Sequence, residues 1–210
     1  MTPSDVRLWI DPSCPWAWQA LRWLLTVRDR GRIELTYSLF SLEINAHALE
    51  RNDVDPGLPF AEAAPMWGQA LAALALARRD GGNDAVEALL VALGNRRHDA
   101  GERPGPAMFA AAAGDAGMPD VFDRAAKTAD LGPQILLEYA EARALDVFGV
   151  PTLQIGDAAA IFGPIISLAP AGQDALALWD QVEGVAVREG FFELKRWPRS
   201  LRPGESAPDP

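Results

Sequence analysis

The chain has 210 residues, of which 49% are hydrophobic and 23% charged, and its formal net charge is −10. This composition is typical of a globular protein with a sizeable core and excludes a disordered chain. The negative charge repels phosphate backbones and the basic residues are scattered, so no nucleic-acid partner is expected. No apolar run is long enough to span a bilayer, and the first five residues lack a signal pattern, so we expect a cytoplasmic protein with no membrane partner.

A single cysteine, Cys14, excludes an intramolecular disulfide. The two histidines and the carboxylates show no recognisable metal-ligand spacing, so no metal site is expected. Packing alone must therefore stabilise the fold.

The first forty residues predict a strand, a helix and a second strand. Residues 6–10 are apolar and rich in β-formers, and a turn cluster follows at residues 11–13. Hydrophobic residues then recur at helical spacing from Trp16 until Gly31 ends the pattern. Residues 33–42 are long enough for a second strand, which completes a βαβ unit.

The rest of the chain predicts a helical block, a hairpin and a last helix. Residues 60–145 are rich in Ala and Leu with helical period. Residues 152–155 and 159–162 predict the hairpin, and a helix around Trp179 closes the pattern. We expect an α/β thioredoxin fold with an all-helical insertion. The thioredoxin-like domain would comprise residues 1–52 and 149–198, the insertion residues 53–148, and a loose tail residues 199–210.

Cys14 follows the first strand and stands at the start of the first helix, in the run Ser13-Cys14-Pro15-Trp16. Unpaired N–H groups of a first helical turn stabilise a thiolate, so this position predicts a nucleophile with a lowered pKa. Pro15 is compatible with the first helical position because the N–H it lacks would be unpaired there. Trp16 is expected to line the cleft at Cys14. The competing interpretation is a buried cysteine that acts as a small hydrophobe.

A second feature is Phe148-Gly149-Val150-Pro151-Thr152, which places a proline directly before a predicted strand. By itself this arrangement often marks only a strand edge. Opposite a reactive cysteine, a cis proline here would turn the Val150 backbone toward a bound ligand.

The sequence resembles DsbA-like proteins of the thioredoxin superfamily through residues 11–16 and 150–152. It is more closely similar to the mycothiol-dependent nitroreductase family through residues 11–23, 94–98, 162–164 and 191–196. Kappa-class glutathione transferases and 2-hydroxychromene-2-carboxylate isomerases are more distant relatives. The resemblance implies that Cys14 is the attacking thiol and Pro151 a cis proline, and that Pro15, Trp16, Val150 and Thr152 support the thiolate and the substrate. It implies no tightly bound cofactor, with mycothiol as a candidate co-substrate.

The chain departs from the dithiol members of these families at Ala17, where they carry a second cysteine. A lone thiol leaves two chemistries open. In the first, Cys14 forms a mixed disulfide or adduct that mycothiol releases, which gives a reductase or thiol transferase. In the second, Cys14 adds reversibly to a conjugated double bond, which gives a redox-neutral cis-trans isomerase. A substrate-binding protein without turnover is the third hypothesis.

Other candidates for substrate or thiol binding have plain structural alternatives. Asn45 lies in a segment similar to the family's, displaced by one position. His47, which we expect in a polar loop, is either a base or only solvated. Trp67 would form an apolar wall of the pocket. Arg96 and His98 would bind a carboxylate or the thiol co-substrate, or else complement a helix end. The expected partner is a small electrophilic molecule, which would be carried on a protein if the isomerase hypothesis holds. The sequence leaves open whether the chain forms a homodimer.

Overall fold

The computed structural model of the chain describes residues 2–51, 59–196 and 201–206. Its sheet contains β1 (Ser4–Ile10), β2 (Ile33–Leu39), β3 (Thr152–Ile155) and β4 (Ile161–Phe162) in the order β2-β1-β3-β4. β1 is parallel to β2 and antiparallel to β3, and β3 is antiparallel to β4. This is the predicted α/β arrangement, a βαβ unit followed by a hairpin.

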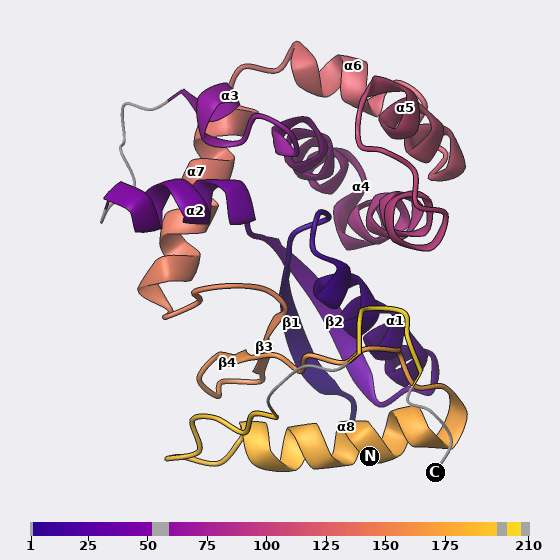
Figure 1. Cartoon of the computed structure of the whole chain (residues 1–210), viewed down its shortest axis with the longest axis vertical. Coiled ribbons are helices and arrows are strands. Elements are labelled where there is room, and N and C mark those ends of the chain that lie inside the picture. The colour runs from indigo at the N-terminus through magenta and orange to yellow at the C-terminus, as the bar shows by residue number, and fades with distance from the viewer. Residues whose placement is uncertain (1, 52–58, 197–200, 207–210) are drawn as a thin grey trace.

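Two helices pack together against the sheet. α1 (Pro15–Asp29) and α8 (Gly172–Ala186) meet through Trp23, whose ring N–H donates to the Ala175 carbonyl at 2.9 Å. The rings of Trp23 and Trp179 lie 6.1 Å apart. Figure 1 shows α8 along one side of the sheet with α1 near it, whereas α3 to α7 are gathered at the other end of the molecule.

β2 ends at Leu39, three residues before the predicted end of that strand. The reason is a helix start that we missed. The hydroxyl of Ser41 accepts the N–H of Ile44 at 3.2 Å, which caps α2 (Leu42–Arg51). His47 therefore lies on a helix and not in the polar loop that we expected.

Only helices are described between α2 and β3. They are α3 (Phe60–Ala63), α4 (Gly68–Gly94), the π-helix η1 (Asn95–Asp99), α5 (Pro106–Asp115), α6 (Val121–Ala126) and α7 (Leu131–Ala144). α4 bends at Gly82, whose φ of 68° is outside the helical region. The expected boundary at residues 52–53 lies outside the described residues, and the one at residues 148–149 lies in the loop between α7 and β3. In the described part of the tail, the N–H of Gly204 donates to the Ser167 carbonyl at 2.5 Å.

These helices cover the outer edge of β2. The amide of Asn83 on α4 donates to the Leu35 carbonyl at 2.8 Å, and Glu138 on α7 accepts the N–H of Leu39 at 2.8 Å. An edge strand with free N–H and C=O groups tends to pair with other chains. The helical block therefore both protects this edge and fixes its own position on the sheet.

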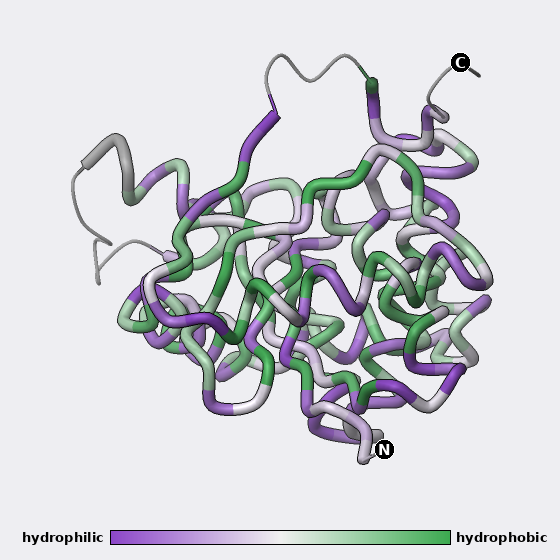
Figure 2. The backbone as a smooth tube through the Cα atoms, turned by 90° about the horizontal axis from the view of Figure 1, so that it is seen from below, coloured by the Kyte–Doolittle hydropathy of each residue, from purple (hydrophilic) through white to green (hydrophobic). Residues whose placement is uncertain are grey.

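The core contains four large aromatic side chains at helical or strand spacing, since Trp9, Trp18, Trp23 and Trp179 are all buried. Figure 2 shows that hydrophobic stretches run through the middle of the molecule while many outer turns are hydrophilic. None of the described helices has the length and apolar content needed to cross a bilayer.

Candidate active site

Cys14 is the N-cap residue of α1, directly after the turn that ends β1. Its N–H donates to the Asp11 carbonyl at 3.0 Å, and its own carbonyl accepts the N–H of Trp18 at 3.0 Å. The Sγ atom lies 3.6 Å from the carbonyl oxygen of Val150, to which the thiol donates. The residue is only 6% exposed. The structure thus brings the predicted nucleophile against the predicted proline loop.

The pKa of the Cys14 thiol is raised, so our expectation of a lowered pKa is wrong. Burial is the largest cause, because it disfavours the charged thiolate. The N–H groups of Ala17 and Trp16 act in the expected direction and lower the pKa, but they do not outweigh burial. The nearby carboxyl group of Asp11 raises it further.

The proline loop is held in place by its own backbone contacts. The Val150–Pro151 bond is cis, as predicted, and so is Gly163–Pro164. The carbonyl of Pro151 accepts the N–H of Gly163 at 2.8 Å, and the hydroxyl of Thr152 donates to the Gly149 carbonyl at 2.7 Å. Val150 and Thr152 are buried, so it is the Val150 carbonyl that faces the sulfur.

Asp11 is the site residue that sequence reasoning missed. It is 1% exposed, and its carboxylate accepts the N–H groups of Ser13 and Leu42, each at 2.7 Å. Burial is the main reason that its pKa is raised, while these two hydrogen bonds oppose that shift. The spacing Asp-x-Ser, typical of a turn in which the Asp side chain accepts the N–H two residues on, was a usable signal.

Asn45 and His47 lie on α2, but the structure gives Asn45 internal partners. Its amide donates to the Phe148 carbonyl at 3.3 Å, and its oxygen accepts the hydroxyl of Tyr139 at 2.8 Å. Asn45 therefore ties α2 to α7 and to the proline loop. His47 is half-buried one turn of α2 away from Glu43, whose carboxylate accepts the N–H groups at the start of α4.

His98 reaches the cysteine loop from the helical block. Its Nε2 atom lies 2.9 Å from the Pro12 carbonyl, which can only accept, so Nε2 carries the proton. Its ring stacks on Trp18 with 6.4 Å between centroids, and the indole N–H of Trp18 donates to Asp99 at 2.9 Å. Burial is the main reason that the pKa of His98 is lowered. η1 therefore bonds to the loop before α1 through His98 and to the first turn of α1 through Asp99.

The side chains of the remaining candidates, Arg96 and Trp67, have their contacts within the helical block. Arg96 forms ion pairs with Asp115 at 2.7 Å and Glu102 at 2.9 Å. Trp67 is buried at the start of α4 and packs edge-on against Phe109. Neither side chain contacts the Cys14 loop through any of these interactions.

Trp16 is half-buried, and its ring packs against the core. Among the described residues, no group of three or more His, Cys, Asp and Glu side chains is suited to a metal ion.

Two exposed phenylalanines stack on each other beside Gly149 of the proline loop. Phe148 is 58% exposed and Phe162 is 39% exposed, and their rings stack with 5.0 Å between centroids. A Cβ added at Gly149 would lie 3.2 Å from the Phe162 ring, so the ring lies close to the loop backbone. We call this pair the phenylalanine shelf.

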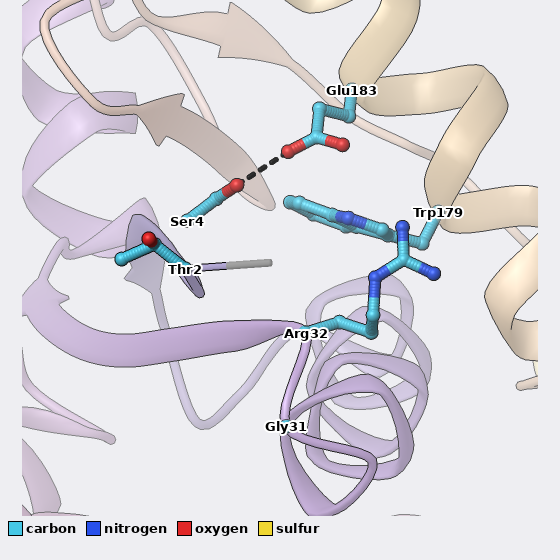
Figure 3. A pocket seen from close by; sticks show the side chains of 6 residues that line it. All are labelled: Thr2, Ser4, Gly31, Arg32, Trp179 and Glu183. Atoms are coloured by element: carbon cyan, nitrogen blue, oxygen red, sulfur yellow. Dashed lines mark hydrogen bonds between the residues drawn. The ribbon is translucent and has the colours of Figure 1, made fainter.

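A small cavity lies at the other end of β1, away from Cys14 (Figure 3). It measures about 20 Å³, room for about one water molecule, and Ser4, Arg32 and Trp179 are among the residues that line it. The Ser4 hydroxyl donates to Glu183 at 2.5 Å across it. None of the predicted site residues contributes to the lining of this cavity.

Solved structures with a similar fold come from the DsbA-like group. A 2-hydroxychromene-2-carboxylate isomerase gives a TM-score of 0.56 at 17% identity, covering 86% of this chain and 94% of that one. The cytosolic disulfide reductase DsbM from Pseudomonas aeruginosa gives 0.56 at 14% identity, with 87% and 100% covered. A probable DsbA oxidoreductase from Streptomyces coelicolor gives 0.55 at 16% identity, with 98% and 100% covered. These likenesses establish the thioredoxin fold.

Sequence similarity identifies the family of this chain within that fold group. The uncharacterized protein Rv2286c of Mycobacterium tuberculosis is 30% identical over 203 residues, which is 95% of this chain and 84% of that protein. Residues 13–196 match the family model described as mycothiol-dependent nitroreductase Rv2466c. That match covers most of the chain, including Cys14 and the cis-proline loop. The protein belongs to the family of mycothiol-dependent nitroreductase Rv2466c.

Proposed function

We propose that this protein is a reductase or thiol transferase in which Cys14 is the nucleophile and mycothiol the co-substrate. The observation that carries the proposal is the position of the Cys14 sulfur. It stands at the first turn of α1, 3.6 Å from the Val150 carbonyl of the cis-proline loop. Membership of the family supports mycothiol as the external thiol.

The reaction begins when Cys14 loses its proton to solvent. With a disulfide substrate, the thiolate attacks one sulfur, the S–S bond breaks, and the other half leaves as a thiolate. A mycothiol thiolate then attacks the substrate sulfur of the mixed disulfide and releases Cys14. The products are a free thiol and a mixed disulfide of mycothiol with the substrate, so the electrons come from mycothiol.

Ala17 supports the need for an external thiol. This side chain occupies the position of a second cysteine, and it is completely buried. No neighbouring thiol exists to resolve the mixed disulfide, because Cys14 is the only cysteine in the chain.

Access to the sulfur requires the contact between Cys14 and Val150 to open. A substrate that takes the place of the Val150 carbonyl removes the acceptor that holds the thiol proton. The N–H groups of Trp16 and Ala17, which already lower the thiol pKa, then stabilise the thiolate.

The phenylalanine shelf supports a small substrate with a flat apolar part. Phe148 stands two residues before Val150, a span of at most about 7 Å of extended chain. A ring attached to the electrophilic atom would therefore reach the shelf while that atom meets the sulfur. Stacking on an aromatic face contributes about 0.5–1.5 kcal/mol beyond the area buried.

A second candidate function is cis-trans isomerisation of a conjugated carbonyl compound. The absence of a resolving thiol at Ala17 favours it, because this route needs none. The Cys14 thiolate adds to the β-carbon and gives an enolate, the former double bond rotates, and the enolate expels the thiolate as the double bond re-forms. No electrons are transferred to or from the substrate overall.

One experiment separates these functions. The protein and its Cys14→Ser variant are incubated with nitroaromatic, disulfide and conjugated enoyl compounds, with and without mycothiol, and products are followed by mass and retention time. The proposal expects turnover that needs stoichiometric mycothiol and is lost in the variant, whose side chain is nearly isosteric. Isomerised product of unchanged mass without added thiol would favour the second function, and full activity of the variant would exclude both.

A further inference from the structure

Asp11 connects the Cys14 loop to the first turn of α2. One carboxylate oxygen accepts the N–H of Ser13 at 2.7 Å, and the other accepts the N–H of Leu42 at 2.7 Å. The Asp11 carbonyl also accepts the N–H of Cys14 at 3.0 Å. The residue before the nucleophile, the nucleophile itself and the start of α2 are thus all bonded to one side chain or its backbone.

This arrangement suits an ionised carboxylate and no near substitute. Both oxygens face N–H donors, so each must act as an acceptor. An asparagine would turn its NH₂ donor toward one of these N–H groups and lose that hydrogen bond, and a protonated aspartic acid would offer a hydroxyl oxygen, a weaker acceptor than a carboxylate oxygen. A buried N–H left without an acceptor costs about 1–3 kcal/mol.

The same turn of α2 holds the opposite side of the site. Asn45 donates to the Phe148 carbonyl at 3.3 Å and is itself oriented by the Tyr139 hydroxyl at 2.8 Å. Phe148 belongs to the loop whose Val150 carbonyl faces the Cys14 sulfur. One helical turn is therefore bonded to both segments that meet at the thiol.

We propose that Asp11 and Asn45 are positioning residues through which the first turn of α2 sets the approach of Cys14 to Val150 and the reactivity of the thiol. The inference rests on the proposed role of Cys14 as the nucleophile. Neither residue needs to touch the substrate for this role.

The two residues act on the thiol in different ways. An ionised Asp11 carboxylate disfavours the Cys14 thiolate through its charge, although burial raises the pKa of both groups and is the larger effect. Glu43 on α2 is the other acid that faces Asp11, and His98 reaches the same loop from η1. Asn45 is neutral, so its loss frees the proline loop and exposes the sulfur without removing a charge.

The test measures the rate at which iodoacetamide alkylates Cys14 as a function of pH, by mass spectrometry of the intact protein. Asp11→Asn should move the midpoint of this profile to lower pH, and a shift of one pH unit makes the variant about tenfold faster below the midpoint. Asn45→Ala should raise the plateau rate severalfold. Asp99→Asn is the matched control, because it removes an acid near α1 while keeping an acceptor for the Trp18 N–H; its profile should stay unchanged.

The proposal is overturned if Asp11→Asn leaves the midpoint in place or raises it, or if Asn45→Ala alkylates at the wild-type rate. If Asp11→Asn does not fold, the ¹³C carboxyl signal of Asp11 in the wild type replaces it. That signal should show a step at the pH where Cys14 ionises, and the step should vanish after alkylation. Its absence would equally refute the proposal.

Failure of this inference can be told apart from failure of the proposed function. Alkylation needs no substrate, so its profile is measured whatever the enzyme turns over. If Cys14→Ser abolishes turnover while Asp11→Asn leaves the alkylation profile unchanged, only the positioning role falls. If Cys14→Ser keeps full turnover, the proposed function falls and the coupling of Asp11 to the thiol is judged on alkylation alone.

Discussion

Gly94 is the position where one added methyl group should do most damage to the site. It is the last residue of α4, with helical φ and ψ, and its missing side chain leaves room for Trp18. An ideal Cβ at this position would lie 2.2 Å and 2.3 Å from two atoms of the Trp18 ring. The ring has little freedom to retreat, because it is buried, bonded to Asp99 and stacked on His98.

The cost of Gly94→Ala follows from three opposing terms. Forcing a methyl group into a packed site costs about 1–3 kcal/mol. Displacing the ring loses its hydrogen bond to Asp99, about 1 kcal/mol. Alanine recovers about 1 kcal/mol through its better helix propensity. The net destabilisation is about 1–3 kcal/mol, which lowers Tm by about 2–12 °C in a chain of this size.

Urea unfolding followed by circular dichroism measures this change directly. Gly184→Ala in α8 is the matched control, because a Cβ there meets nothing within 4 Å and should stabilise the protein slightly. In the Trp18→Leu background, Gly94→Ala should cost less unfolding free energy than it does in the wild type, since the clash is with the indole ring. The reasoning would be refuted if Gly94→Ala were as stable as Gly184→Ala.

Two further predictions concern the loop and its neighbours. Burial holds the pKa of His98 below its ordinary value of 6.5, so the folded state binds this proton less readily than the unfolded chain. We therefore expect the difference in unfolding free energy between the wild type and His98→Ala to be largest above about pH 6.5. The difference should shrink as the pH falls through the lowered pKa. A pH-independent difference in urea unfolding would contradict this. Ala17→Cys should form a disulfide with Cys14 on oxidation, and substrate reduction should then respond to dithiol reductants as well as to mycothiol. Mass spectrometry of the oxidised variant checks this. Two free thiols would show that the two positions do not meet as the helical spacing requires.

Local patterns were enough to predict the elements that position the nucleophile. The strand before Cys14, the helix after it and the hairpin after Pro151 each depend on side-chain periodicity and turn residues close in sequence. The end of β2 was predicted too late, because the alternation of residues 33–42 outweighed the capping signal at Ser41. That error also placed His47 in a loop.

Contacts between distant segments decided what the local pattern could not. The raised pKa of Cys14 comes from burial, and the sulfur contacts the Val150 carbonyl, which is 136 residues away in sequence, whereas the N–H groups of its own helix lower the pKa. Asn45 and His98 likewise have their hydrogen-bond partners on distant segments, at the carbonyls of Phe148 and Pro12.

Strand, turn and helix signals are local, so the residue pattern was enough to predict a thioredoxin-fold chain with one thiol at a helix start. How that thiol is held and how readily it ionises follow from packing between distant segments. Desolvation and the hydrogen bonds of Asp11 depend on which segments surround the sulfur, and no short stretch of the chain contains that information.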